Sequence, residues 1–169
     1  MSLQGKHVVI VGGASGMARK LAEDAVAEGA AVTWAGRAPE RLVLPGVRAA
    51  YADLGDEQSL KALAEDVGEL DHLVSLAADP ANGPLATLDR AAVELAPIRV
   101  NALSPDIVDS GAWDRLGEAM EGLFRRTAES NPARRVGTTA NISAAARQAL
   151  TNPFVTGTIL HVDGGARLG

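Results

Sequence analysis

Residues 9–18, with the sequence VIVGGASGMA, join a β-branched run to closely spaced glycines. Gly12 and Gly16 lack the Cβ that would block an approaching phosphate group, and Ser15 can add a hydroxyl donor. Backbone N–H groups at the start of a helix, here near Met17, attract negative charge. The segment therefore predicts a turn that binds the pyrophosphate of a dinucleotide, with a tight structural turn as the alternative.

Residues 34–37, with the sequence WAGR, end the second predicted strand. At this place an acidic residue binds the 2′-hydroxyl of the adenosine ribose, whereas an arginine accommodates a 2′-phosphate. The segment contains Arg37 and no carboxylate. It therefore favours NADP(H) over NAD(H), the alternative being that Arg37 is a solvent-facing turn residue.

Alternating strands and helices must position these residues. The apolar patterns predict strands at residues 6–12, 31–35, 47–52, 72–77, 98–103 and 158–162. Helices are expected at residues 17–28, 57–67 with Asp56 as the cap, 87–95, 113–128 and 142–150. This alternation predicts an α/β fold of the three-layer Rossmann type, with helices on both faces of a doubly wound parallel sheet.

Composition limits the class of protein. A length of 169 residues suits a single domain, 1–169, and its core must be built from small and branched side chains because only 3% of residues are aromatic. The chain has no cysteine, a net charge of −5 and no apolar run long enough for a membrane span, and we expect no signal peptide. We expect a soluble, cytoplasmic protein that binds neither nucleic acid nor membranes.

No group of residues has the spacing of a metal site. His7, His72 and His161 lie in or beside predicted strands without acidic or hydroxyl partners at a telling spacing, so we expect them to be structural. We therefore expect no metal.

The sequence resembles the short-chain dehydrogenase/reductase family along nearly its whole length. Gly12-x-x-x-Gly16-x-Ala18 is similar to the family's glycine pattern, and Asp53-Leu54 to its pair that contacts the adenine. Residues 98–113 resemble its sixth strand and nicotinamide loop, and residues 152–165 its last strand and closing turn. The resemblance implies cofactor-binding roles for Gly12, Ser15, Gly16, Met17, Arg37, Asp53, Leu54, Ala77, Ile107 and Ser110.

The catalytic residues of that family are missing. The resemblance implies a Tyr-x-x-x-Lys pair and a serine, but the only tyrosine, Tyr51, is followed four residues later by Gly55. We infer an internal deletion with its join near residues 92–95, which removes a helix, a strand and most of a second helix. The sheet of about six strands would then have the order 3-2-1-4-5-6, and no catalytic residue is assigned.

Two further departures concern the cofactor. Asp106 replaces the glycine of the nicotinamide loop, and residues 75–78 replace the family's Asn-Asn-Ala-Gly. Three readings stay open: an NADP(H)-binding protein without hydride transfer, a weak carbonyl reductase or alcohol dehydrogenase with another proton donor, and a structural or interaction protein that binds no nucleotide. A homo-oligomer, either a dimer or an altered tetramer, is expected because the deletion affects the helices of the family's usual interface.

Overall fold

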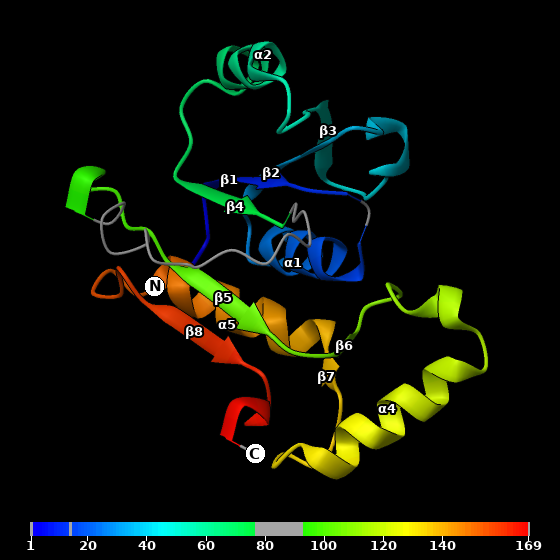
Figure 1. The fold of residues 1–169 in the computed structure, drawn as a ribbon. Helices are drawn as coiled ribbons and strands as arrows, with labels where there is room; N and C mark the ends of the chain where they lie inside the picture. The colour runs from blue at the N-terminus through cyan, green and yellow to red at the C-terminus, as the bar shows by residue number, and fades with distance from the viewer. Residues whose placement is uncertain (1, 14, 77–92, 169) are drawn as a thin grey trace. The chain divides into compact units, whose positions relative to one another are not determined.

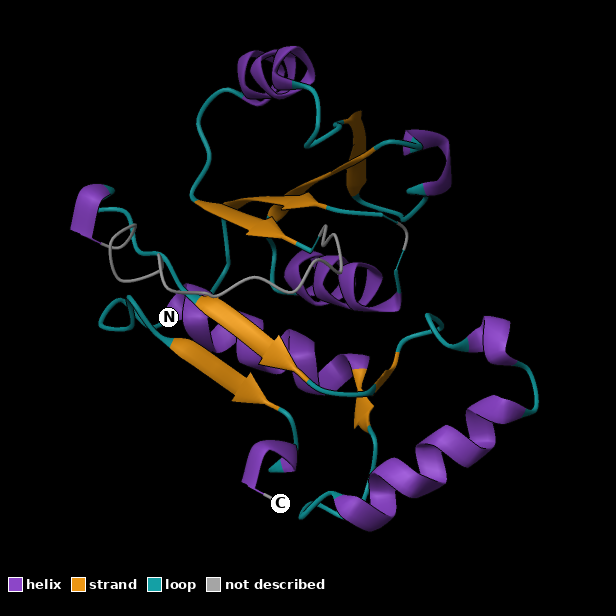
Figure 2. Ribbon diagram, viewed as in Figure 1, coloured by secondary structure: helices purple, strands orange, loops and turns teal. Residues whose placement is uncertain are grey.

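The structure is a computed structural model that describes residues 2–13, 15–76 and 93–168. The chain divides into two compact units, Met1–Pro80 and Ala81–Gly169. Figures 1 and 2 show the elements of each unit. The single domain expected for residues 1–169 stays a prediction.

The first unit contains a four-stranded parallel sheet in the order β3-β2-β1-β4. Its strands are β1 (His7–Val11), β2 (Ala31–Gly36), β3 (Val47–Tyr51) and β4 (His72–Ser75). Helices α1 (Gly16–Ala27) and α2 (Glu57–Val67) lie on opposite faces of this sheet, and the short 3-10 helix η1 (Pro39–Arg41) follows β2 (Figure 1). This arrangement confirms the predicted α/β Rossmann-like fold and the order 3-2-1-4.

Local sequence signals explain why these elements form. Helix α1 buries Ala18, Leu21, Ala22 and Ala25, which recur at helical spacing on one face. Helix α2 begins after Asp56, whose carboxylate accepts a hydrogen bond from the Gln58 amide at 2.9 Å. The predicted bounds 57–67 and the predicted cap are therefore confirmed.

Asp71 ties the start of β1 to the loop that precedes β4. Its Oδ1 accepts a hydrogen bond from Lys6 Nζ at 2.8 Å, and its Oδ2 accepts one from the His7 amide at 2.8 Å. The Lys6 ammonium and then the His7 N–H lower the pKa of the Asp71 carboxyl below its ordinary value of 3.8. The charged carboxylate thus favours the folded state.

We expect acid to remove this stabilisation. Because the pKa of Asp71 is lower in the folded than in the unfolded state, the stabilisation is present above pH 3.8 and is lost as the pH falls through the folded-state value. In urea unfolding, the difference in free energy of unfolding between the wild type and Asp71→Asn should shrink as the pH is lowered past 3.8. A difference that stays constant across that range would contradict the assignment.

The second unit contains two small parallel pairs of strands. Strand β5 (Ala102–Pro105) pairs with β8 (Ile159–Val162), and β6 (Val108–Asp109) pairs with β7 (Gly137–Thr138). Two longer helices, α4 (Ala119–Ser130) and α5 (Thr139–Thr151), belong to this unit. The 3-10 helices η2 (Asp114–Leu116) and η3 (Ala166–Leu168) also belong to it (Figure 2).

The predicted continuous sheet 3-2-1-4-5-6 is not observed among the described residues. There β5 forms hydrogen bonds with β8, the expected last neighbour, and the four-stranded sheet has β4 as its last strand. The register of β5 with β8 runs from Ala102 opposite Ile159 to Pro105 opposite Val162. Most of the helix predicted at residues 87–95 lies outside the described residues.

One further prediction about the second unit needs correction. The fifth strand begins at Ala102 rather than at residue 98, because Arg99 and Asn101 direct their side chains to α5 and the segment after it.

Within the described ranges, none of the helices has the length and apolar character needed to cross a membrane.

Candidate functional site

The glycine-rich turn lies between β1 and α1, as predicted. The Gly12 amide donates a hydrogen bond to the Ala35 carbonyl at 2.9 Å, which fixes the turn against β2. Ser15 is the N-cap of α1, and its Oγ accepts a hydrogen bond from the Ala18 amide at 3.3 Å. The Ser15 oxygen therefore also caps the helix, a role the sequence analysis did not assign, while its hydroxyl hydrogen can still be donated.

Gly16 and Met17 open α1, and both are half-buried. The Ala18 side chain is fully buried, which fits the expected close packing of helix and strand at the third position of the glycine pattern. The turn thus places the start of α1 directly after the carboxyl end of β1.

The ends of the four parallel strands meet at one edge of the first sheet. An added Cβ on Gly36 would lie 2.8 Å from the Gly12 carbonyl oxygen, so β2 and the turn approach more closely than a side chain allows. The Ala52 amide donates to the Gly36 carbonyl at 3.1 Å, and the Leu76 amide donates to the Val11 carbonyl at 2.7 Å. Ligands of open parallel sheets bind at this carboxyl edge.

Arg37 follows β2 at this edge, and its side chain is exposed. Within the described part of the chain it takes part in no hydrogen bond or ion pair. Its guanidinium group is therefore available to an anion, as a residue that binds a 2′-phosphate must be. Its role stays a prediction.

Asp53 and Leu54 follow β3 and have different environments. Asp53 Oδ1 accepts a hydrogen bond from the Gly55 amide at 3.0 Å, and the Asp53 amide donates to Ser59 Oγ at 2.9 Å. The aspartate therefore shapes the turn that leads into α2. Leu54 is 50% exposed, which leaves its side chain accessible to an apolar ring such as adenine.

The remaining predicted cofactor residues do not belong to the described part of the first unit. Ala77 lies outside the described residues. Ile107 and Ser110 belong to the second unit and are half-buried. The Ile107 carbonyl accepts a hydrogen bond from the Gly137 amide at 3.1 Å, so this oxygen already takes part in the contact between β6 and β7.

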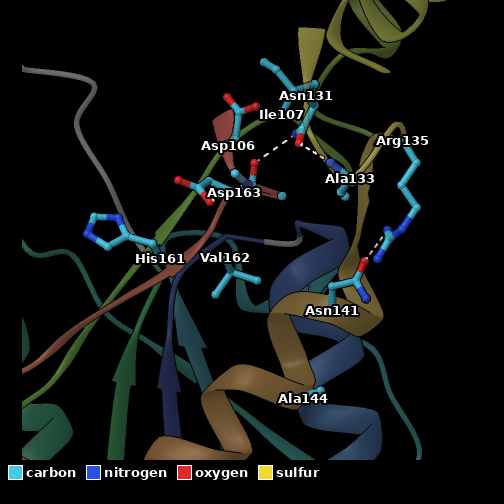
Figure 3. A pocket seen from close by; sticks show the side chains of 13 residues that line it. Asp106, Ile107, Asn131, Ala133, Arg135, Asn141, Ala144, His161, Val162 and Asp163 are labelled. Atoms are coloured by element: carbon cyan, nitrogen blue, oxygen red, sulfur yellow. Dashed lines mark hydrogen bonds between the residues drawn. The ribbon is translucent and has the colours of Figure 1, made fainter. Parts of the chain in front are cut away.

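The second unit has a pocket of about 440 Å³ that sequence reasoning did not find (Figure 3). The figure shows Asp106, Asp163 and His161 along one part of its wall and Arg135 with Asn141 along another. Arg135 Nη1 donates to Asn141 Oδ1 at 2.8 Å. Two carboxylates share this pocket with one guanidinium group, so it does not have the uniformly positive lining of a phosphate site.

A tight turn forms one side of the pocket. The Gly165 N–H donates to Asp163 Oδ1 at 2.9 Å and, as the largest cause, lowers the pKa of the Asp163 carboxyl below 3.8. Gly164 has a φ of 61°, and an added Cβ would lie 2.6 Å from Asn131 Oδ1. The sequence Asp163-Gly164-Gly165 was the only signal of this turn, since Asn131 is distant in sequence.

No arrangement of acid and base for hydride chemistry is found in the described residues. Tyr51 is exposed on β3. Each of the three lysines forms an ion pair, Lys6 with Asp71 at 2.8 Å, Lys20 with Asp24 at 2.6 Å and Lys61 with Glu57 at 2.8 Å. The lysines therefore pair with carboxylates and not with the tyrosine hydroxyl.

His7 forms hydrogen bonds within the first unit, as expected of a structural histidine. Its Nδ1 lies 2.9 Å from the Glu69 carbonyl, and its Nε2 lies 3.0 Å from Thr33 Oγ1. The exposed His161 instead lines the pocket of the second unit. Within the described ranges no three His, Asp or Glu side chains are grouped closely enough to hold a metal ion.

Two family models match the chain. The model described as short chain dehydrogenase matches residues 6–108, and the model described as enoyl-(acyl carrier protein) reductase matches residues 85–167. No curated protein shows significant similarity to the chain.

Solved structures share the fold. A small-chain dehydrogenase in complex with NADPH has a TM-score of 0.74 at 22% identity, covering 98% of this chain and 100% of that chain. The MalC reductase/Diels-Alderase from Malbranchea aurantiaca has a TM-score of 0.85 at 21% identity, with coverages of 99% and 98%. A short-chain type dehydrogenase/reductase from Mycobacterium ulcerans has a TM-score of 0.85 at 21% identity, with coverages of 99% and 92%.

Proposed function

We propose that this chain, which belongs to the short-chain dehydrogenase family, binds NADP(H) through its N-terminal unit and does not transfer hydride. The main support is Arg37, an exposed arginine without an ion-pair partner in the described part of the chain, directly after β2. A guanidinium group can form two parallel hydrogen bonds with a phosphate, and no carboxylate stands beside it in residues 34–37 to receive a ribose 2′-hydroxyl.

The residues at the carboxyl edge of the first sheet fit such a cofactor. The close approach of Gly36 to the Gly12 carbonyl leaves no room for a Cβ, and the Gly13 position faces open space. The pyrophosphate would lie at the start of α1, with Gly12, Ser15, Gly16 and Met17 beside it. The adenine would lie near Asp53 and Leu54. The neighbour of known structure that contains NADPH has the same fold.

The nicotinamide end of the cofactor would need residues beyond the glycine-rich turn. When NADPH is bound to a family enzyme, its nicotinamide ring supplies a hydride for a carbonyl group. On this chain Ile107 and Ser110 are the candidates to orient that ring, and Ala77 the candidate after β4. Asp106 places a carboxylate in the same loop as Ile107 and Ser110, and this carboxylate repels the negatively charged diphosphate.

Proton transfer is the step for which we assign no residue. A general acid must lie within hydrogen-bond reach of the reacting oxygen. The chain contains no Tyr-x-x-x-Lys, and its lysines form ion pairs with carboxylates. We propose that a deletion with its join near residues 92–95 removed the segment that contains the acid.

Calorimetric titration with NADPH and NADH tests the proposal. We expect saturable binding of NADPH that is tighter than that of NADH, and no oxidation of NADPH when a panel of aldehydes and ketones is added. Oxidation of NADPH that depends on a carbonyl would contradict the loss of hydride transfer and would favour a weak reductase. No binding at millimolar NADPH would contradict the proposed function and would favour a structural or interaction protein.

A further inference from the structure

We propose that Trp34 is a positioning residue that orients the phosphate-binding turn through its indole N–H, an inference that rests on the nucleotide binding proposed above. Trp34 lies on β2, and its side chain is fully buried. Its Nε1 donates a hydrogen bond to the Gly12 carbonyl at 3.1 Å, from 22 residues along the chain. A buried indole N–H needs a hydrogen-bond partner, and here that partner is a carbonyl of the glycine-rich turn.

The hydrogen bond determines which way the next peptide group faces. The peptide between Gly12 and Gly13 is trans, so its C=O and N–H point in opposite directions. Because the carbonyl is directed towards Trp34 in the core, the Gly13 N–H is directed away from it. Gly13 is exposed, and an added Cβ there would meet no atom within 4 Å.

The Gly13 N–H is therefore available to a ligand. Within the described part of the chain it donates no hydrogen bond, whereas the Gly13 carbonyl accepts one from the Ser15 amide at 2.7 Å. A free backbone donor next to the start of α1 is suited to a phosphate oxygen. Trp34 acts on this donor through the Gly12–Gly13 peptide and does not itself contact the phosphate.

Neighbouring residues of β2 restrain both polar groups of Gly12. The Gly12 amide donates to the Ala35 carbonyl, while the Gly12 carbonyl accepts from Trp34 and lies against Gly36. Among the described residues the indole is the hydrogen-bond donor to this carbonyl. Without it, the peptide can rotate so that the carbonyl reaches water, which turns the Gly13 N–H away from the ligand.

Replacement of Trp34 by phenylalanine tests this role, because it keeps an aromatic ring and removes the N–H. The probe is adenosine 2′,5′-bisphosphate, which has a 5′-phosphate for the turn and a 2′-phosphate for Arg37 but no nicotinamide. We expect Trp34→Phe to bind this probe about tenfold more weakly than the wild type, the effect of one ordinary hydrogen bond on an equilibrium constant. Far-ultraviolet circular dichroism checks that the variant is folded.

The chain provides a matched control in its second tryptophan. Trp113 Nε1 also donates to a backbone carbonyl, that of Val108, at 3.0 Å, but it belongs to the second unit. Trp113→Phe therefore removes the same kind of hydrogen bond from the unit that contributes no residue to the proposed phosphate site. We expect its affinity for the probe to equal that of the wild type.

Nuclear magnetic resonance of the wild type gives a readout that does not depend on a variant folding. Addition of the probe should shift the indole N–H resonance of Trp34, because its acceptor belongs to the peptide that binds the phosphate, and should leave that of Trp113 in place. A Trp34 resonance that stays fixed at saturation, or a folded Trp34→Phe with unchanged affinity, would overturn the role of Trp34. A wild type that binds neither the probe nor NADPH would instead overturn the proposed function.

Discussion

Replacement of Arg37 by aspartate is expected to weaken NADPH binding about 100-fold while NADH binding stays equal or becomes tighter. Hydrogen bonds to a charged group contribute roughly 1.5–3 kcal/mol, and every 1.4 kcal/mol changes a dissociation constant about tenfold. The aspartate also repels the 2′-phosphate and can accept a hydrogen bond from a ribose 2′-hydroxyl. Calorimetry with both cofactors measures the ratio of the two dissociation constants.

Arg41 provides the matched control for this substitution. It lies in η1, four residues after Arg37, and its side chain is also exposed. Arg41→Asp makes the same change in net charge, so a general electrostatic effect would weaken NADPH binding equally in both variants. A preference ratio that changes only in Arg41→Asp would transfer the 2′-phosphate role to Arg41, and a ratio unchanged in both would refute an arginine contact with this phosphate.

The first unit could be predicted almost completely because its elements are specified by nearby residues. Helix α2 has both its cap, Asp56, and its apolar face within one short segment, and its observed bounds equal the predicted ones. Strand β1 is a β-branched run that glycines terminate. For these elements, sequence signals only a few residues apart were sufficient.

The second unit was less predictable because its structure depends on contacts between distant residues. Two-residue strands such as β6 and β7 have no periodicity to detect, and each forms only through the other. The apolar run after residue 98 predicted a strand, but the Arg99 side chain bonds to carbonyls some 50 residues later. Sequence reading treats such an arginine as a surface charge.

The candidate site also has features that the sequence predicted and features that only the folded structure revealed. The glycine turn between the first strand and the first helix was predicted, and Arg37 was expected at the end of the second strand, because both depend on residue types at known positions in a βαβ unit. The capping role of Ser15 and the contact of Trp34 with Gly12 were not predicted. A buried tryptophan in a strand reads as core, and only the folded geometry places its N–H against a carbonyl of the turn.

Replacement of Arg99 by leucine is expected to destabilise the second unit by about 3 kcal/mol. The Arg99 guanidinium donates to the carbonyls of Ala149, Leu150 and Val155 at 2.7, 2.6 and 2.9 Å, and it therefore joins the end of α5 to the segment before β8. Removal leaves three carbonyls without this donor and takes a positive charge from a helix C-terminus. We expect the loss in free energy of unfolding to stay near 3 kcal/mol because the contributions of hydrogen bonds that share one side chain are not additive.

Urea unfolding followed by circular dichroism measures this change, and two further variants identify its cause. Arg99→Lys keeps the charge but lacks the planar guanidinium group that reaches several carbonyls at once. We therefore expect it to recover less than half of the lost free energy of unfolding. Arg115→Leu removes an exposed arginine of the same unit and should change the free energy of unfolding by less than about 0.5 kcal/mol. Equal stabilities of Arg99→Leu and the wild type would mean that water replaces the guanidinium at all three carbonyls, and the end of α5 would then be held by packing alone.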